Sequence, residues 1–268
     1  MKKNEPTVLT SLENRVLTIT LNRPQARNSI NGQLTVLLHQ VVSAAAKDDQ
    51  VGAIVLTGAD KEFCVGSDIH AMGGKSRQSG KRGMSSERLL QLGAEISMLL
   101  HKMPKPTIAM IRGTAAGSGL SLAAACDFRF ADWSAKLCFA NGNIGLSGDF
   151  GGAYFLQQLL GVSQAREFCL LTPKVPAQEA ASMGLVTRCV PDEELEQQVY
   201  GVARQLAMGP AEALGRIKQN LNIAITKPPT DYLRQEVTSF MRCRSSAEHK
   251  EAVSAFIEKR EPVFYPDK

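Results

Sequence analysis

Three glycine-bearing turns, each following an apolar run, carry the residues that could do chemistry. They span residues 63–69, 113–121 and 144–152. Small residues let the backbone N–H groups of a turn approach a ligand closely, and a turn that opens a helix directs unpaired N–H donors at negative charge. Two such turns facing one carbonyl group would form an oxyanion hole. Each turn could equally do no more than join a strand to a helix, and composition alone leaves both interpretations open.

The third turn also holds a carboxylate. Asp149 precedes Phe150, Gly151 and Gly152, where a helix is predicted to begin. An aspartate at this place is well suited to cap the helix N-terminus. Alternatively, a carboxylate desolvated by a neighbour such as Phe150 could remove a proton from a carbon acid and return it elsewhere. The residues themselves leave both roles open.

Several other kinds of site are excluded by motif. The second turn lacks a full GxGxxG with an acidic residue downstream, and no Gly-Lys-Ser/Thr follows it, so neither a dinucleotide fold nor a P-loop is predicted. The six cysteines are scattered without a CxxC pair, and the four histidines lie far apart. This pattern predicts no metal site, no disulfide framework and reduced thiols, as in a cytoplasmic enzyme.

The net charge of +5 is concentrated in one segment. Residues 73–88 carry a net charge of +4, and the rest of the chain is close to neutral. This segment has no aromatic residue, which argues against a nucleic-acid surface. Its glycines and serines are typical of a surface loop, either simply solvated or meeting a polyanionic small molecule. The basic residues are Lys75, Arg77, Lys81, Arg82 and Arg88.

The elements that must position these turns alternate between strand and helix. Apolar, β-branched runs at 16–21, 53–56, 107–111 and 128–130 predict buried strands, with helical periodicity between them. Strands separated by helices indicate an α/β fold with a mostly parallel sheet. From about residue 151 the pattern is almost entirely helical, with one more strand expected within 184–190. No apolar run is long enough to span a membrane, and none resembles a signal peptide.

The helical end of the chain has apolar faces that we expect to need a partner. We divide the chain into a core at 1–190, with the ligand site, and a helical oligomerisation region at 191–268. Closed symmetry is the usual outcome for such homo-oligomers. The apolar residues of these faces are Leu195, Val199, Val202 and Leu206, and then Leu233, Val237, Phe240 and Met241.

Six motifs in register resemble the crotonase family, the enoyl-CoA hydratases and isomerases. They lie at 21–31, 63–68, 116–127, 144–149, 184–186 and 255–260, and the resemblance runs from residue 16 to about 264. It implies a crotonase-like spiral of ββα units with a helical C-terminal trimerisation region, in a homo-trimer or a hexamer. It further implies a coenzyme A thioester as substrate, no permanently bound cofactor and no metal.

The resemblance also implies roles for individual residues. Ser67 and Ser118 match the two residues whose backbone N–H groups hold the oxygen of a thioester enolate, and a backbone donor does not depend on its side chain. Positions that line the coenzyme A nucleotide and pantetheine match Arg23, Ala26, Arg27, Ser67, Asp68 and Ile69. We expect the acyl pocket to be formed by Ser121, Asn141, Met72 and Phe139.

The chain departs from the hydratases at their water-activating pair. The two glutamates of that pair match Ser121 and Asn141, and neither side chain can act as a base at neutral pH. Asp149 instead matches an aspartate of isomerase-type relatives, such as dienoyl-CoA isomerases and the ring-opening isomerases of phenylacetate breakdown. Naphthoate synthases and a benzoyl-CoA dehalogenase resemble it there too.

The resemblance therefore favours an enoyl-CoA double-bond isomerase in which Asp149 is the catalytic carboxylate. Two alternatives stay open. One is a hydratase-like protein with weak or no hydratase activity. The other is a catalytically silent protein that binds acyl-CoA or an acyl-carrier protein. No nucleic-acid or membrane partner is expected.

Overall fold

The computed structural model describes residues 5–72 and 84–265, with the side chains of Ala71 and Met72 excepted. Its main sheet has six strands in the order β1-β2-β3-β4-β6-β9. Strands β1 and β2 form an antiparallel hairpin, and all other neighbours in this sheet are parallel. The predicted α/β class with a mostly parallel sheet is thus confirmed. The strands are β1 (Val8–Glu13), β2 (Val16–Leu21), β3 (Ala53–Gly58), β4 (Thr107–Ile111), β6 (Phe128–Asp132) and β9 (Arg188–Val190).

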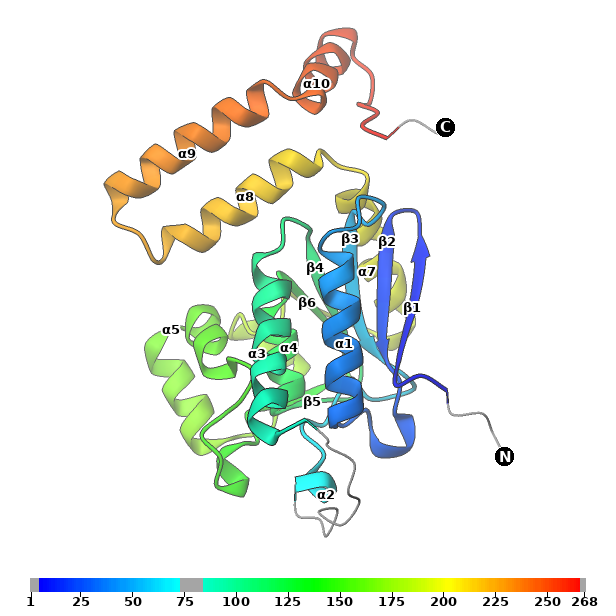
Figure 1. Cartoon of the computed structure of the whole chain (residues 1–268), viewed down its shortest axis with the longest axis vertical. Helices are drawn as coiled ribbons and strands as arrows, with labels where there is room; N and C mark the ends of the chain where they lie inside the picture. The colour runs from blue at the N-terminus through cyan, green and yellow to red at the C-terminus, as the bar shows by residue number, and fades with distance from the viewer. Residues whose placement is uncertain (1–4, 73–83, 266–268) are drawn as a thin grey trace.

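Helices cover both faces of this sheet because its central strands are apolar on both sides. Successive residues of a strand point to opposite faces, so Ile54 packs with helices α1 (Gly32–Ala45) and α3 (Ser86–Lys102), whereas Val55 packs with α7 (Asp192–Ala207). Figure 1 shows α1 and α3 in front of the sheet and α7 behind it. A parallel sheet buried in this way is typical of α/β proteins.

Helix α7 corrects one expectation from the sequence. Leu195 and Val199 are fully buried against the sheet within this chain, so the prediction that they need a partner subunit is wrong. Their helical spacing is the same whether a sheet or another subunit covers them, and the pattern cannot tell the two apart.

A second, smaller sheet supports the turns that carry the chemistry. It has the strand order β5-β7-β8, and every residue of helix α4, which follows β5, is buried. The order β4, β5, α4 and then β6, β7 sends consecutive strands alternately to the two sheets. These elements are β5 (Thr114–Ala116), α4 (Ser118–Ala125), β7 (Lys136–Cys138), η3 (Gly142–Ile144), α5 (Gly152–Leu171) and β8 (Val175–Pro176).

The last three helices stand away from the sheet, with α9 running along α8 (Figure 1). Helix α8 is anchored by Lys218, whose Nζ lies 2.7 Å from Asp127 Oδ2 and also donates to two backbone carbonyl groups. None of the helices in the described ranges has the length and apolarity to cross a membrane. The remaining helices are η1 (Pro24–Ala26), α2 (Ile69–Met72), α6 (Ala177–Ser182), α8 (Ala211–Ala224), α9 (Pro229–Arg244) and α10 (Ala247–Glu258).

One close contact fixes α3 against the third turn. Phe150 is buried, and a Cβ built on Gly93 of α3 would lie 1.8 Å from its ring atom Cε1. Only a glycine at position 93 leaves room for this ring. The residue after Asp149 is therefore seated in a notch in α3.

We predict that Gly93→Ala destabilises the protein by about 1–3 kcal/mol, because the new methyl group overlaps the Phe150 ring. Gly201→Ala is the matched control, since Gly201 lies in α7 and a Cβ added there would have no other atom within 4 Å. An alanine at this position should raise stability by about 0.5–1 kcal/mol. Urea denaturation of both variants checks this, and a Gly93→Ala protein as stable as the wild type would contradict the fit.

Candidate active site

The first two turns are joined directly by backbone hydrogen bonds. The Cys64 N–H donates to the Thr114 carbonyl oxygen at 2.9 Å, and the Ala116 N–H donates to the Cys64 carbonyl oxygen at 3.0 Å. Immediately beyond this bridge, Gly66 has φ +96° and a Cβ there would lie 2.9 Å from the Ala116 oxygen. The chain can make this approach because residue 66 has no side chain. Ser67 and Ser118 consequently lie side by side.

The amide groups of these two serines are free to donate a hydrogen bond, although Ser118 itself is fully buried. The flanking Gly66 carbonyl and Asp68 N–H both bond to Ile30 at 2.8 Å, so the Ser67 N–H points to the opposite side. Ser118 is the first residue of α4, where an N–H has no acceptor within its own helix. In residues 5–72 and 84–265, no acceptor is found for either amide. Two adjacent N–H donors of this kind suit the oxygen of an enolate.

Asp149 comes from the third turn and meets both serines. Its Oδ2 lies 2.8 Å from Ser118 Oγ and 3.2 Å from Ser67 Oγ, and the two hydroxyl oxygens are 2.6 Å apart. Its Oδ1 is buried and has no partner among the described residues. The structure thus brings the three predicted catalytic residues into one cluster.

The turn that presents Asp149 has a left-handed backbone on both sides of it. Gly148, Phe150 and Gly151 have φ values of +121°, +49° and +77°. A positive φ is costly for phenylalanine, and it persists here because Phe150 is buried against Gly93. Gly151 occupies the N-cap position of α5, and no side chain caps this helix. The interpretation of Asp149 as a helix cap is therefore wrong, and its carboxylate is directed at the serines instead.

Ser121 and Asn141, which match the water-activating glutamates of the hydratases, have different surroundings in the structure. Ser121 is fully buried, its Oγ donates to the Gly117 oxygen at 3.1 Å, and a Cβ on Gly152 would lie 2.3 Å from that Oγ. The hydroxyl of Ser121 is thus packed closely against Gly152. Asn141 is also buried, and its Oδ1 has no hydrogen-bond partner within the described ranges. This oxygen lies close to the second turn, since a Cβ built on Gly117 would be 3.5 Å from it.

Of the two other residues predicted to line the acyl pocket, the structure describes the side chain of Phe139 and leaves out that of Met72. Phe139 is buried beneath the third turn, where its ring limits the side chains possible at Gly148 and Gly152. It supports the turn that carries Asp149. Met72 ends α2, and its side chain lies outside the described residues, as do residues 73–83 with most of the basic segment.

The residues expected to line coenzyme A surround the first turn. Arg23 Nη2 lies 2.9 Å from Asp68 Oδ2, and this ion pair ties the residue after Ser67 to the chain entering the site. Ala26 is half-buried, whereas Arg27 and Ile69 are exposed. Arg23 and Arg27 thus both contact the first turn, Arg23 through Asp68 and Arg27 through its carbonyl oxygen, which accepts from the Val65 N–H at 3.3 Å.

Arg27 also takes part in an ion pair that sequence reasoning missed. Its Nη2 lies 2.7 Å from Glu62 Oε1, and Glu62 Oε2 accepts from the Thr114 N–H at 2.6 Å. Partial burial raises the pKa of Glu62, but the hydrogen bonds from Thr114 and Arg27 outweigh it, so the pKa lies below its usual value. Glu62 thus fastens the start of the second turn in its ionised form.

The described residues near the cluster offer neither a reactive thiol nor a metal site. Burial raises the pKa of the Cys64 thiol to about 12, so this thiol stays protonated and is a poor nucleophile at neutral pH. Within the described ranges, no three His, Cys, Asp or Glu side chains gather in a way that could hold a metal ion.

Comparison with known proteins agrees with this geometry. Residues 11–267 match the sequence model of the enoyl-CoA hydratase/isomerase family. The chain is 35% identical over 258 residues to the 1,2-epoxyphenylacetyl-CoA isomerase of Escherichia coli K12, covering 96% of this chain and 97% of that protein. It is 31% identical over 255 residues to the short-chain-enoyl-CoA hydratase of Clostridium acetobutylicum, covering 94% and 95%.

Solved structures give the same result. An enoyl-CoA hydratase of Mycobacterium smegmatis superposes with a TM-score of 0.88 at 28% identity, over 98% of this chain and 100% of that one. One from Bacillus anthracis also has a TM-score of 0.88, at 27% identity over 96% and 98%. The chain belongs to the enoyl-CoA hydratase/isomerase family and has the crotonase fold, as the resemblance of its motifs implied.

We predict that Ser121→Glu destabilises the protein by about 3–5 kcal/mol and gives it no hydratase activity, because the new carboxylate is buried without a partner. Ser121→Ala, which removes only a bond to the helix's own backbone, should change stability by less than about 1 kcal/mol. Denaturation and a crotonyl-CoA hydration assay check both variants. A stable Ser121→Glu protein that hydrates crotonyl-CoA would show that the position can hold a water-activating carboxylate.

Proposed function

We propose that the protein is an enoyl-CoA double-bond isomerase that works through a thioester enolate, with Asp149 as its single mobile base. The observation that carries the proposal is the Asp149 carboxylate, which is held through Oδ2 beside the two amide donors, while Oδ1 has no partner in the described part of the chain. The similarity to an isomerase of epoxyphenylacetyl-CoA supports it. Other relatives are named as hydratases, and the departures at positions 121 and 141 support isomerisation over hydration for this chain.

In the first step, Asp149 Oδ1 removes a proton from the α-carbon of a 3-enoyl thioester. The electron pair of that C–H bond moves into the conjugated system, and the negative charge comes to lie on the thioester oxygen. The Ser67 and Ser118 N–H groups donate hydrogen bonds to this oxygen. In the second step, the protonated Asp149 returns its proton to the γ-carbon, which leaves the double bond between the α- and β-carbons.

The charge of the site stays constant throughout this sequence. A negative charge moves from the carboxylate to the thioester oxygen and back, and at no point do two full charges face each other in a buried site. Preorganised donors are most effective when the charge arises where they already point. Neither Ser121 nor Asn141 can deprotonate a water molecule for addition to the β-carbon. The enolate therefore forms by removal of the α-proton and is consumed by protonation at the γ-carbon.

We take the substrate to be an acyl-CoA, with no other cofactor. Arg27, whose guanidinium pairs with Glu62 just before the first turn, would meet the phosphates of coenzyme A, and we expect the same of the basic residues that follow this turn in the sequence. Two alternatives are separable by binding: an acyl group carried on an acyl-carrier protein, and a catalytically silent acyl-CoA-binding protein. Calorimetry with acyl-CoA and with an acyl-carrier protein distinguishes the carriers, and turnover excludes the silent protein.

We predict that Asp149→Asn lowers kcat for 3-enoyl-CoA isomerisation by ~10²–10⁴-fold, the usual contribution of a general base, and leaves acyl-CoA affinity nearly unchanged. A panel of 2-enoyl-, 3-enoyl- and dienoyl-CoA substrates, assayed with both proteins, measures this. Efficient hydration of crotonyl-CoA by the wild type, no turnover of any member of the panel, or full isomerase activity of Asp149→Asn would overturn the proposal.

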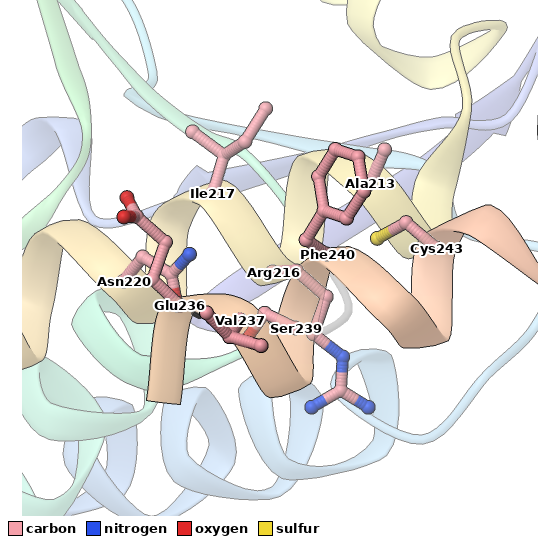
Figure 2. Close-up of a pocket in the computed structure, with 9 residues that line it drawn as sticks. All are labelled: Ala213, Arg216, Ile217, Asn220, Glu236, Val237, Ser239, Phe240 and Cys243. Atoms are coloured by element: carbon pink, nitrogen blue, oxygen red, sulfur yellow. Dashed lines mark hydrogen bonds between the residues drawn. The ribbon is translucent and has the colours of Figure 1, made fainter. Parts of the chain in front are cut away.

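We further propose that helices α8 and α9 meet other copies of this chain in a trimer or hexamer. Between them lies a groove of about 490 Å³ whose walls include Ile217, Val237 and Phe240. Figure 2 shows Ile217 from α8 and Phe240 from α9 projecting from the same side of the helix pair. All three side chains are more than half exposed in the single chain. Apolar area of this kind on one surface is typical of an interface.

We predict that Phe240→Glu shifts the protein towards smaller species in sedimentation, because the charge would be buried at the contact. Thr10→Glu places the same charge on exposed strand β1 and should leave the wild-type assembly intact. A wild-type protein that sediments as a stable monomer at micromolar concentration would contradict this part of the proposal.

A further inference from the structure

The hydroxyl groups of Ser67 and Ser118 have no role as oxyanion donors, because those donors are the backbone amides. Both hydroxyls nevertheless contact one carboxylate oxygen and each other, at 2.8, 3.2 and 2.6 Å. Ser118 is fully buried, so its hydroxyl is out of contact with bulk solvent. These side chains therefore have their own place in the site.

Counting protons gives the direction of the hydrogen bonds. An ionised Asp149 can only accept, and the two hydroxyls supply two protons for three contacts. The two shortest contacts then take the protons: Ser67 donates to Ser118 Oγ, and Ser118 donates to Asp149 Oδ2. The 3.2 Å contact between Ser67 and Oδ2 is left without a proton of its own.

We propose that Ser118, supported by Ser67, is a positioning residue that acts through Asp149. Its hydrogen bond holds Oδ2 and so fixes the rotation of the carboxylate, which leaves Oδ1 as the oxygen that takes the substrate proton. This rests on the proposed function, since it assumes that Asp149 is the base.

The backbone alone does not fix this rotation. The left-handed turn around Asp149 and the seating of Phe150 set where the α-carbon lies, but the terminal torsion of an aspartate is broad. A charge-assisted hydrogen bond from a fully buried donor narrows that torsion.

The test is a double-mutant cycle of Ser118→Ala and Asp149→Asn, with but-3-enoyl-CoA isomerisation as the probe. We expect Ser118→Ala to lower kcat by about 10- to 100-fold with little change in KM, because the base loses its orientation while substrate binding is kept. In the Asp149→Asn background the same substitution should have no further effect, because the group through which it acts is already neutral. Ser97→Ala, which removes an equally buried hydroxyl from α3, should leave kcat unchanged.

The outcomes separate this proposal from the one it rests on. Wild-type kcat in Ser118→Ala, together with an impaired Asp149→Asn, would overturn the positioning role and leave the base intact. Effects that multiply in the double variant would also overturn it, since Ser118 would then act independently of Asp149. Full activity in Asp149→Asn would instead remove the base itself.

Ser67→Ala removes the first hydroxyl in the series of hydrogen bonds from Ser67 through Ser118 to Asp149. It should lower kcat by a smaller factor than Ser118→Ala, because its effect on Oδ2 passes through Ser118. It provides the test if Ser118→Ala does not fold. A larger loss in Ser67→Ala than in Ser118→Ala would contradict the order of the chain.

Discussion

The two backbone hydrogen bonds between Cys64 and residues 114–116 are the constraint on which the site depends. They join segments about fifty residues apart and place the first residue of α4 beside the turn after β3. Two unpaired amides are costly to bury, and here they lie close together because the parallel bridge between Cys64 and Ala115 holds their two segments side by side. The amide pair is thus a consequence of this backbone bridge and owes little to the serine side chains.

The Asp149 carboxylate reaches the two amides from the third turn, whose backbone is strained. Left-handed residues surround Asp149, and the favourable burial of Phe150 against Gly93 offsets the cost of holding them. Helix α4 is wholly buried, so the amide of Ser118 belongs to one of the least mobile parts of the chain. A base and its enolate donors on such rigid supports need little reorganisation as charge moves between them.

Much of this arrangement was predictable from residue patterns. The apolar runs predicted the central strands, the glycine turns predicted the available amides, and the motif spacing predicted the family. The packing of α7 was not predictable, since Leu195 and Val199 form the same stripe whichever surface covers them. The contacts of Asp149 with Ser67 and Ser118 also escaped, because they depend on three turns meeting in space. The contact between Gly93 and Phe150 could not be predicted either, because the sequence shows only a glycine inside a predicted helix.

The most direct test of the single mobile base follows one hydrogen atom. A 3-enoyl-CoA carrying deuterium at its α-carbon is isomerised in ordinary water, and the 2-enoyl-CoA product is examined by NMR early in the reaction. If Asp149 removes and returns the same deuteron from a buried oxygen, part of the label appears at the γ-carbon. A product with no γ-deuterium even at the earliest times, or a 3-hydroxyacyl-CoA in its place, would show that water or a second base carries the proton.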